Sequence, residues 1–183
     1  MLQKPYYLVA IPEGEIMGRL RRLQTFLSRR FRMYRAPYPG LHLTVGVIED
    51  VHKISDSFSL LRDITAEHPP FSVNIEGERC FDEPFLSVGV DIVSEKLAYL
   101  SGEVEGALSN AGLTPRTFNR WNFHISLIHP QFARRAWSRE EFQEACQIVK
   151  EYAPHGCCQL TGLELWEPEF PPLNVVERFS FSS

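Results

Sequence analysis

The sequence predicts an α+β protein of two lobes, each a small sheet backed by helices. Stretches with helical spacing of apolar residues alternate with short strand-like runs, and the order helix, strand, strand recurs in both halves of the chain. Size agrees with this fold class, because 183 residues with 44% hydrophobic side chains can bury a substantial core. We therefore expect residues 1–183 to form a single bilobal domain.

Proline and glycine punctuate the elements of the first half. A strand ends at Pro12, and the helix after it carries apolar residues at helical spacing. A turn at Pro39-Gly40 precedes the next strand, and a second helix ends before Pro69-Pro70. The predicted elements are, in order, strand 6–11, helix 15–30, strand 41–48, helix 55–67, and strands 71–76 and 85–90.

The second half repeats this order with its own boundary signals. Gly112 is a stop signal for the first helix, and Pro115 breaks the chain before the next strand. Ser138 with Glu141 three residues later forms a capping box, which opens the last helix. The predicted elements are helix 94–110, strand 122–128, helix 138–152, and strands 158–166 and 175–181.

The most informative pattern is a tetrapeptide that occurs once in each half. His42-Leu43-Thr44-Val45 and His124-Ile125-Ser126-Leu127 both read histidine, apolar, hydroxyl, apolar. Successive side chains of a strand alternate between its two faces, so each histidine shares a face with the hydroxyl two residues on. The apolar residues then point into a core. Two such strands facing one another would place two imidazoles and two hydroxyls around one cleft.

These four side chains suit the cleavage of a phosphodiester that has a neighbouring 2′-hydroxyl, or of a 2′,3′-cyclic phosphate. One histidine takes a proton from the attacking oxygen and the other gives one to the departing oxygen, because an imidazole pKa of roughly 6.5 populates both forms near neutrality. The hydroxyls can donate hydrogen bonds to the non-bridging oxygens, where charge grows. This chemistry requires neither a metal ion nor a cofactor. One copy of the pattern occurs by chance in many proteins, whereas two copies at matching places favour a catalytic or phosphate-binding role.

The chain resembles the two-histidine phosphoesterase superfamily, in particular its bacterial 2′-5′ RNA ligase-like and cyclic phosphodiesterase branch. The resemblance lies in the order of elements and in the motif residues His42, Thr44, His124 and Ser126. The resemblance implies two pseudo-symmetric lobes, each with a small, mostly antiparallel sheet, around a central cleft lined by both motifs. It implies metal-independent action on 2′,3′-cyclic or 2′-5′ phosphodiester bonds of RNA ends or nucleotides. His42 and His124 are then the general acid and base, and Thr44 and Ser126 bind phosphate. The segment 121–123 lacks the Pro-His start common in close relatives, which leaves the subfamily open.

Further candidates for substrate contacts flank the two motifs. A guanidinium matches phosphate oxygens bidentately, and an aromatic ring can stack on a nucleobase. His129, at the end of the second motif strand, is placed to reach a substrate. The candidates are Arg35, Arg116, Arg120, Tyr38, Trp121 and His129. For each of them, solvation or ordinary packing is the alternative interpretation.

The composition of the chain limits the kinds of binding partner that we expect. A formal net charge of −4 argues against a protein that coats long nucleic acid, although it permits an RNA end or a small cyclic or 2′-5′ nucleotide. The start of the chain lacks signal-peptide features and no run approaches a membrane span, so we expect no membrane partner and a cytoplasmic location. The four cysteines lack Cys-x-x-Cys spacing, which favours reduced thiols. The two halves already supply both motifs, so we expect a monomer.

Two other functions remain open at this stage. A non-catalytic module of the same fold that binds a nucleotide or an RNA end would keep the cleft without turnover. A metallohydrolase would use His42, His124 and His129, but neither tetrapeptide contains a carboxylate and the chain has no His-Glu-x-x-His helix. Saturable binding without product would indicate the first, and metal analysis of the purified protein tests the second.

Overall fold

The computed structural model describes residues 4–49, 53–117, 123–167 and 173–183. Its helices are α1 (Glu15–Phe31), α2 (Asp56–Ala66), α3 (Glu95–Asn110) and α4 (Arg139–Tyr152), with a short 3-10 turn, η2 (Pro130–Phe132). Its strands are β1 (Tyr6–Ala10), β2 (Leu43–Ile48), β3 (Phe71–Phe81), β4 (Ser87–Val93), β5 (Pro115–Thr117), β6 (Phe123–Ile128), β7 (Gly156–Leu160), β8 (Gly162–Glu167) and β9 (Asn174–Ser180). None of the helices in these described ranges is both long and apolar enough to cross a membrane.

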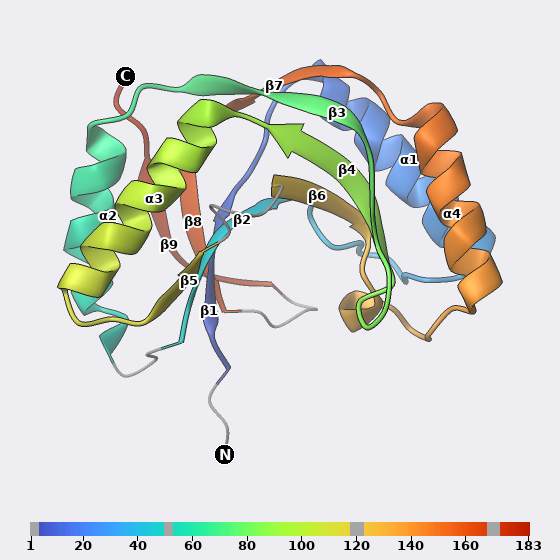
Figure 1. Cartoon of the computed structure of the whole chain (residues 1–183), viewed down its shortest axis with the longest axis horizontal. Helices are drawn as coiled ribbons and strands as arrows, with labels where there is room; N and C mark the ends of the chain where they lie inside the picture. Colours follow the sequence, from blue (N-terminus) through green and yellow to red (C-terminus); the bar gives the residue numbers. More distant parts are fainter. Residues whose placement is uncertain (1–3, 50–52, 118–122, 168–172) are drawn as a thin grey trace.

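The strands form one curled sheet whose order is β7-β3-β4-β6-β2-β1-β8-β9, with β5 beside β2. Every strand pairing found among the described residues is antiparallel. Helices α1 and α4 pack on the β7-β3-β4-β6 side, called here the β6 lobe, and α2 and α3 pack on the β2-β1-β8-β9 side, the β2 lobe. Figure 1 shows the two helix pairs at opposite sides of the molecule, with the sheet arching between them. The expected α+β fold of two lobes is confirmed.

The two motif strands are neighbours at the centre of this sheet. Leu43 of β2 pairs with Ile125 of β6, and this pair joins the two lobes. The two lobes do not coincide with the two halves of the chain, because each lobe takes strands and helices from both. Helix α1, for example, follows a strand of the β2 lobe and packs on the β6 lobe. The lobes are therefore interleaved, and neither is a contiguous piece of sequence.

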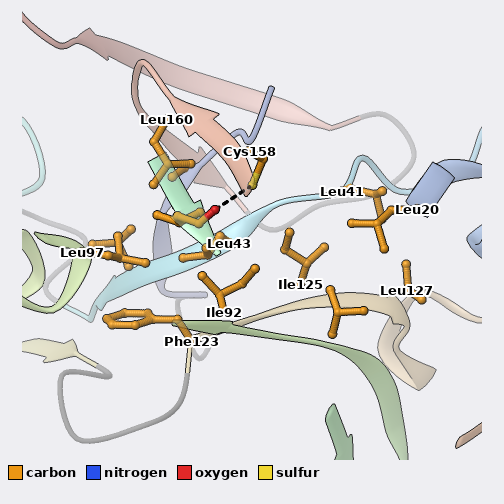
Figure 2. Close-up of a cluster of buried hydrophobic side chains, with 14 of the residues drawn as sticks. Leu20, Leu41, Leu43, Ile92, Leu97, Phe123, Ile125, Leu127, Cys158 and Leu160 are labelled. Carbon is orange, nitrogen blue, oxygen red and sulfur yellow. Dashed lines mark hydrogen bonds between the residues drawn. The ribbon is translucent and has the colours of Figure 1, made fainter. Parts of the chain in front are cut away.

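Alternation along the motif strands places their apolar residues in the core, as predicted. The side chains of Leu43, Val45, Ile125 and Leu127 are fully buried, with 0% exposure. Figure 2 shows three of them among residues contributed by both lobes. Burying a side chain of this size stabilises the fold by roughly 1.5–3 kcal/mol, so the core fixes which face of each strand points inward. The histidines and hydroxyls consequently occupy the opposite face.

The predicted elements need three corrections. The single strand expected over residues 158–166 is two strands, β7 and β8, which separate at Thr161. Strand β5 was not predicted, because Pro115 was interpreted as a break; a proline is tolerated at the first residue of a short strand, where its missing N–H matters least. Strands β3 and β4 extend further along the chain than expected, to Phe81 and Val93. The capping box of Ser138 and Glu141 at the start of α4 is confirmed.

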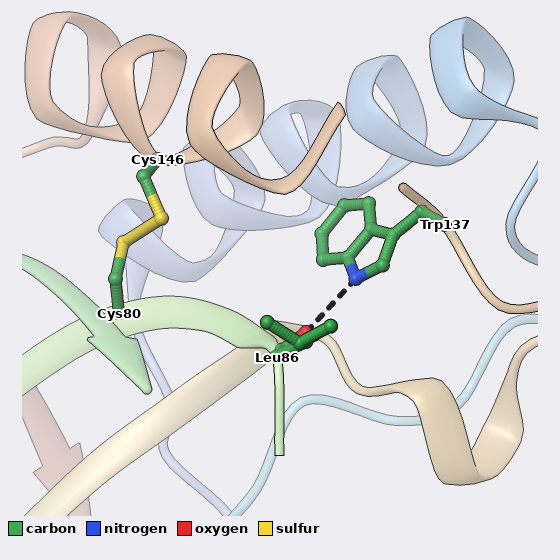
Figure 3. The surroundings of a disulfide bond; sticks show 4 residues. All are labelled: Cys80, Leu86, Trp137 and Cys146. Carbon is green, nitrogen blue, oxygen red and sulfur yellow. Dashed lines mark hydrogen bonds between the residues drawn. A yellow bond between two sulfur atoms is a disulfide. The ribbon is translucent and has the colours of Figure 1, made fainter. Parts of the chain in front are cut away.

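Two of the four cysteines are joined, which contradicts the prediction of reduced thiols. A disulfide connects Cys80, near the end of β3, with Cys146 of α4. Figure 3 shows this bond between the helix and the strand beneath it. The two residues are 66 positions apart in sequence, so spacing alone gave no sign that they meet. Cys157 and Cys158 are free thiols, the first exposed and the second buried.

Candidate active site

A cleft of about 370 Å³ opens on the face of β2 and β6 that is turned away from the core. All four motif side chains line it, and so do two of the other candidates from the sequence. The lining consists of Tyr7, Tyr34, Pro39, Gly40, His42, Thr44, Val47, Phe81, Phe85, Ser87, Arg116, Phe123, His124, Ser126, His129, Gln131, Phe132, Trp166 and Leu173.

Strand register determines how the four motif side chains lie. Because β2 and β6 run antiparallel through the pair Leu43–Ile125, His42 lies on the side of Ser126 and Thr44 on the side of His124. The two histidines are therefore diagonal neighbours on one sheet face, a relation that places two residues about 7–8 Å apart. Each imidazole has the hydroxyl of the other motif beside it. The four groups surround one space, which is large enough for a tetrahedral anion.

His42 has a defined tautomer. Its Nδ1 lies 2.8 Å from the carbonyl oxygen of Gly40, and because a carbonyl only accepts, Nδ1 carries the proton. The lone pair of the neutral ring is therefore on Nε2. Burial lowers the pKa of His42 below its ordinary value of 6.5, and the bond to Gly40 opposes this in part. A neutral ring with an available Nε2 is the form that accepts a proton.

The loop that carries Gly40 is itself held by helix α1. The buried amide of Gln24 donates to the carbonyl of Pro39 at 3.1 Å. This contact joins the helix to the residue before Gly40, and so fixes the carbonyl that orients the His42 ring. Gln24 is a positioning residue, since it holds Pro39 of the lining but does not itself line the cleft.

Each histidine is covered by an aromatic ring that comes from the strand two places farther out in the sheet. Trp166 of β8 lies 4.6 Å from His42, and Phe81 of β3 lies 4.5 Å from His124, measured between ring centroids. Strands β8 and β3 occupy equivalent places on either side of the central pair. The carboxylate of Glu164 accepts the indole N–H at 2.7 Å, which fixes the Trp166 ring. The pseudo-symmetry of the lobes thus extends from the motifs to the aromatic residues that cover them.

His129 is a third imidazole in the cleft, held where β6 leads into η2. Its backbone N–H donates to the hydroxyl of Tyr34 at 2.7 Å, and its Nδ1 accepts from the N–H of Gln131 at 3.2 Å. The neutral ring therefore carries its proton on Nε2. Burial lowers the pKa of His129, and repulsion from His42 when that ring is protonated lowers it further. Burial also raises the pKa of Tyr34 to about 12, so this phenol keeps its proton.

The charged and titratable side chains of the lining favour an anion. They are three histidines, Arg116 and the phenols of Tyr7 and Tyr34, and none of the described lining residues is an aspartate or a glutamate. Arg116 lies at the β5 side of the cleft, 3.6 Å from the carboxylate of Glu49. Across the described ranges, no group of three or more His, Cys, Asp or Glu residues is arranged to hold a metal ion.

The site residues predicted from the sequence fall into three groups in the structure. His42, Thr44, His124, Ser126, Arg116 and His129 meet in one cleft. Arg35 is exposed and does not line it, and Tyr38 packs against Tyr34 instead. Arg120 and Trp121 lie outside the described residues. The sequence reasoning missed Trp166, Phe81, Phe85 and Ser87, which reach the cleft from outer strands and a loop and lie in no recognisable motif.

Comparison with known families agrees with this geometry. The model of the 2′-5′ RNA ligase superfamily matches residues 12–169, which include both histidine motifs and most of the sheet. The chain belongs to the 2′-5′ RNA ligase superfamily. No individually curated protein matches it. The two-histidine phosphoesterase resemblance inferred from the tetrapeptides is therefore confirmed at the level of the family.

Solved structures share the fold over almost the whole chain. TT0787 of Thermus thermophilus is 16% identical, with a TM-score of 0.66 and 97% of each chain covered. E. coli LigT in its apo form is 14% identical, with a TM-score of 0.62 and 98% of each chain covered. The MHV ns2 PDE domain is 10% identical, with a TM-score of 0.56, and the match covers 97% of this chain and 99% of that one. At these identities the likeness establishes the fold alone.

Proposed function

We propose that this chain is a phosphoesterase that cleaves 2′,3′-cyclic or 2′-5′ phosphodiester bonds of RNA ends or nucleotides. One observation carries the proposal: two histidine–hydroxyl pairs, from adjacent strands in antiparallel register, line one cleft whose described walls contain no carboxylate. Membership of the 2′-5′ RNA ligase superfamily supports it. A binding module would need contacts to the phosphate but would not need two titrating groups on either side of it.

The proposed reaction begins with the phosphate between the two imidazoles. His42 is the general base, because its lowered pKa keeps the ring neutral and its Nδ1 bond to Gly40 leaves Nε2 to accept a proton. It takes the proton of the attacking water, or of the 2′-hydroxyl in the cyclisation direction. His124 gives a proton to the departing oxygen. The roles exchange when the reaction runs in the opposite direction, so a 2′-5′ ligation is the same chemistry reversed.

Hydrogen bonds from the hydroxyl groups stabilise the charge that develops on phosphorus oxygens. Thr44 and Ser126 donate to the two non-bridging oxygens from opposite strands, and these contacts strengthen as charge grows in the transition state. Arg116 and the Nε2–H of His129 add positive potential or a donor at the two ends of the cleft. The proposed chemistry uses no metal ion or cofactor. The described lining lacks the carboxylates that hard divalent cations require, and its histidines belong to no group of three described residues arranged to hold a metal ion.

A single nucleotide or one RNA end is the proposed substrate, bound by a monomer. Among the similar structures, E. coli LigT has been solved with phosphate, ATP, NADP+ and 3′-AMP. The cleft of the present chain has a volume of about 370 Å³, which suits a nucleotide and excludes a long duplex. Both motifs come from one chain, so no second copy is needed to complete the site.

The decisive experiment measures turnover in single histidine variants. Purified protein is incubated with adenosine 2′,3′-cyclic phosphate and with 2′-5′-linked ApA, with and without EDTA, and the 2′- and 3′-phosphate products are resolved. We expect His42→Ala and His124→Ala each to lower kcat by about 10²–10⁴-fold, since each removes one positioned proton-transfer group. EDTA should have no effect. His155→Ala, an exposed histidine outside the cleft, is the matched control.

The same experiment separates the alternatives. Full turnover in both His42→Ala and His124→Ala would exclude acid–base catalysis by this pair. Tight nucleotide binding by the wild-type protein without any product would indicate the non-catalytic module. Loss of activity on EDTA treatment, restored by a divalent cation, would indicate a metallohydrolase.

A further inference from the structure

One end of the cleft is built from residues that the proposed reaction does not use. Phe81 and Ser87 are directly paired across β3 and β4, and Phe85 belongs to the loop that joins these strands. Val88 pairs with Ile128, so Ser87 lies where β6 leads into η2, with its Gln131 and Phe132. We call Phe81, Phe85, Ser87, Gln131 and Phe132 the outer end of the cleft.

The hydroxyl of Ser87 has the properties of a ligand contact. Only 2% of the residue is exposed, it lines the cleft, and no described residue forms a hydrogen bond with this hydroxyl. Among the described residues, no buried side-chain oxygen or nitrogen lacks a hydrogen-bond partner, so the Ser87 hydroxyl, which has none, must be accessible from the cleft. The other buried serines behave in the ordinary way: Ser101, for example, donates to the carbonyl of Val45 at 3.1 Å. Ser87 therefore offers an unused donor and acceptor to a molecule in the cleft.

Phe85 is an exposed aromatic ring at the same place. It is 53% exposed although it lines the cleft. The loop that carries it is firmly held: the carbonyl of Asp82 accepts from the amides of Phe85 and Leu86 at 3.1 and 3.3 Å. The indole of Trp137 donates to the carbonyl of Leu86 at 3.0 Å, a contact visible in Figure 3.

The backbone next to Phe85 is also in an uncommon conformation. Leu86 has a φ of 45°, in the left-handed region that residues with a side chain rarely adopt. Such conformations persist only where surrounding contacts enforce them, and they gather at ligand clamps. Here the contacts from Asp82 and Trp137 enforce it. The conformation fixes the direction of the chain between the exposed ring of Phe85 and the hydroxyl of Ser87 that faces the cleft.

We propose that the outer end is a nucleobase subsite, in which the base stacks on Phe85 and the Ser87 hydroxyl bonds to the base edge. A flat, apolar molecule with a polar rim fits an exposed ring next to an unpartnered hydroxyl, and a nucleobase is such a molecule. A serine hydroxyl both donates and accepts, so this contact serves any of the four bases. This inference rests on the proposed function, and it assigns the part of the cleft that holds the base of the RNA end or nucleotide.

The test compares two substrates that differ only in the base. One is adenosine 2′,3′-cyclic phosphate, and the other is 1-O-methyl-ribofuranose 2,3-cyclic phosphate. For the nucleotide we expect Phe85→Leu to lower kcat/KM roughly five- to hundredfold, since stacking is lost. Ser87→Ala should lower it about two- to tenfold, as expected for one hydrogen bond. Both variants should leave kcat/KM for the base-free substrate unchanged. Phe26→Leu, an equally exposed phenylalanine that does not line the cleft, is the control.

The outcomes separate this inference from the proposed function. The nucleobase subsite would be overturned if the variants lost kcat/KM equally on both substrates. It would also be overturned if the wild-type protein had the same kcat/KM for both. Absence of turnover on both substrates would contradict the proposed function instead. The subsite is then tested by calorimetric binding of 3′-AMP against ribose 3-phosphate: weaker 3′-AMP binding in Phe85→Leu supports it, and unchanged binding refutes it.

Discussion

At the scale of single residues, the two imidazoles of the cleft are not equivalent. His42 is held through Nδ1 by a backbone carbonyl, and its burial lowers its pKa. Trp166 provides much of the cover on this side, because its ring lies 4.6 Å from the imidazole and is itself fixed by Glu164. The indole thus acts through His42: it keeps water from the ring and favours the neutral form that serves as a base.

This assignment predicts the pH dependence of a Trp166→Ala variant. A general base must be deprotonated, so kcat/KM falls as the pH drops below its pKa. In the wild-type protein this acidic limb should lie below 6.5, since burial lowers the pKa of His42. Removal of the indole admits water, raises the pKa toward its ordinary value, and should move the acidic limb to higher pH. The measurement is the profile of kcat/KM between about pH 4.5 and 8, because a group near 6.5 titrates there.

The control for this profile is Tyr152→Ala, which removes an exposed ring that does not line the cleft. Its acidic limb should coincide with that of the wild-type protein. If Trp166→Ala and the wild-type protein share one acidic limb, His42 is not the base, and the two roles proposed here must be exchanged.

At the scale of secondary-structure elements, the position of His124 depends on how closely β4 approaches β6. Gly89 pairs with Ser126, and a β-carbon added at Gly89 would lie 2.1 Å from the carbonyl oxygen of Ile125. No side chain fits there, so glycine is required by the close approach of the two backbones. The strand that carries the second motif is therefore placed by a residue without a side chain.

A Gly89→Ala variant should lose both stability and activity. The added methyl group has to push β4 from β6, and overpacking of this kind destabilises a fold by about 1–3 kcal/mol. Because His124 and Ser126 move with β6, kcat/KM should fall as well. The free energy of unfolding is measured by urea denaturation, alongside the kinetics. In Gly102→Ala, a helical position in α3 with nothing within 4 Å, the same change should stabilise by roughly 0.5–1 kcal/mol. A Gly89→Ala protein with wild-type stability would show that the strands can separate freely.

The elements also show what the sequence can and cannot predict. The motif strands and the capping box of α4 were predictable, because alternation and cap chemistry are local patterns. The division between β7 and β8 was not, because β7 pairs with β3 and β8 pairs with β1 and β9, and these partners are remote in sequence. The same reason applies to the site. Thr44 and Ser126 share a tetrapeptide with their histidines, whereas Trp166 and Phe81 reach the histidines only through the fold.

At the scale of the whole molecule, the lobes are held together by contacts between remote parts of the chain. The sheet order is symmetric about the central strands, and α1 and α4, from opposite ends of the sequence, pack on the same lobe. Neither half of the chain contains a complete lobe. The two motifs therefore meet only where elements from both halves of the chain have come together.

The Cys80–Cys146 disulfide adds a covalent link to this arrangement. It ties the end of β3 to α4 and closes a loop of 66 residues, which restricts the unfolded chain. We expect Cys146→Ser to lower the free energy of unfolding by about 2–4 kcal/mol. For a chain of this size that corresponds to a fall in Tm of about 5–15 °C. A reductant should lower the Tm of the wild-type protein by the same amount and leave that of Cys146→Ser unchanged. Cys157→Ser, which removes an exposed free thiol, should match the wild-type protein with and without reductant. A wild-type Tm that does not respond to reductant would mean that the link contributes nothing to the stability of the fold.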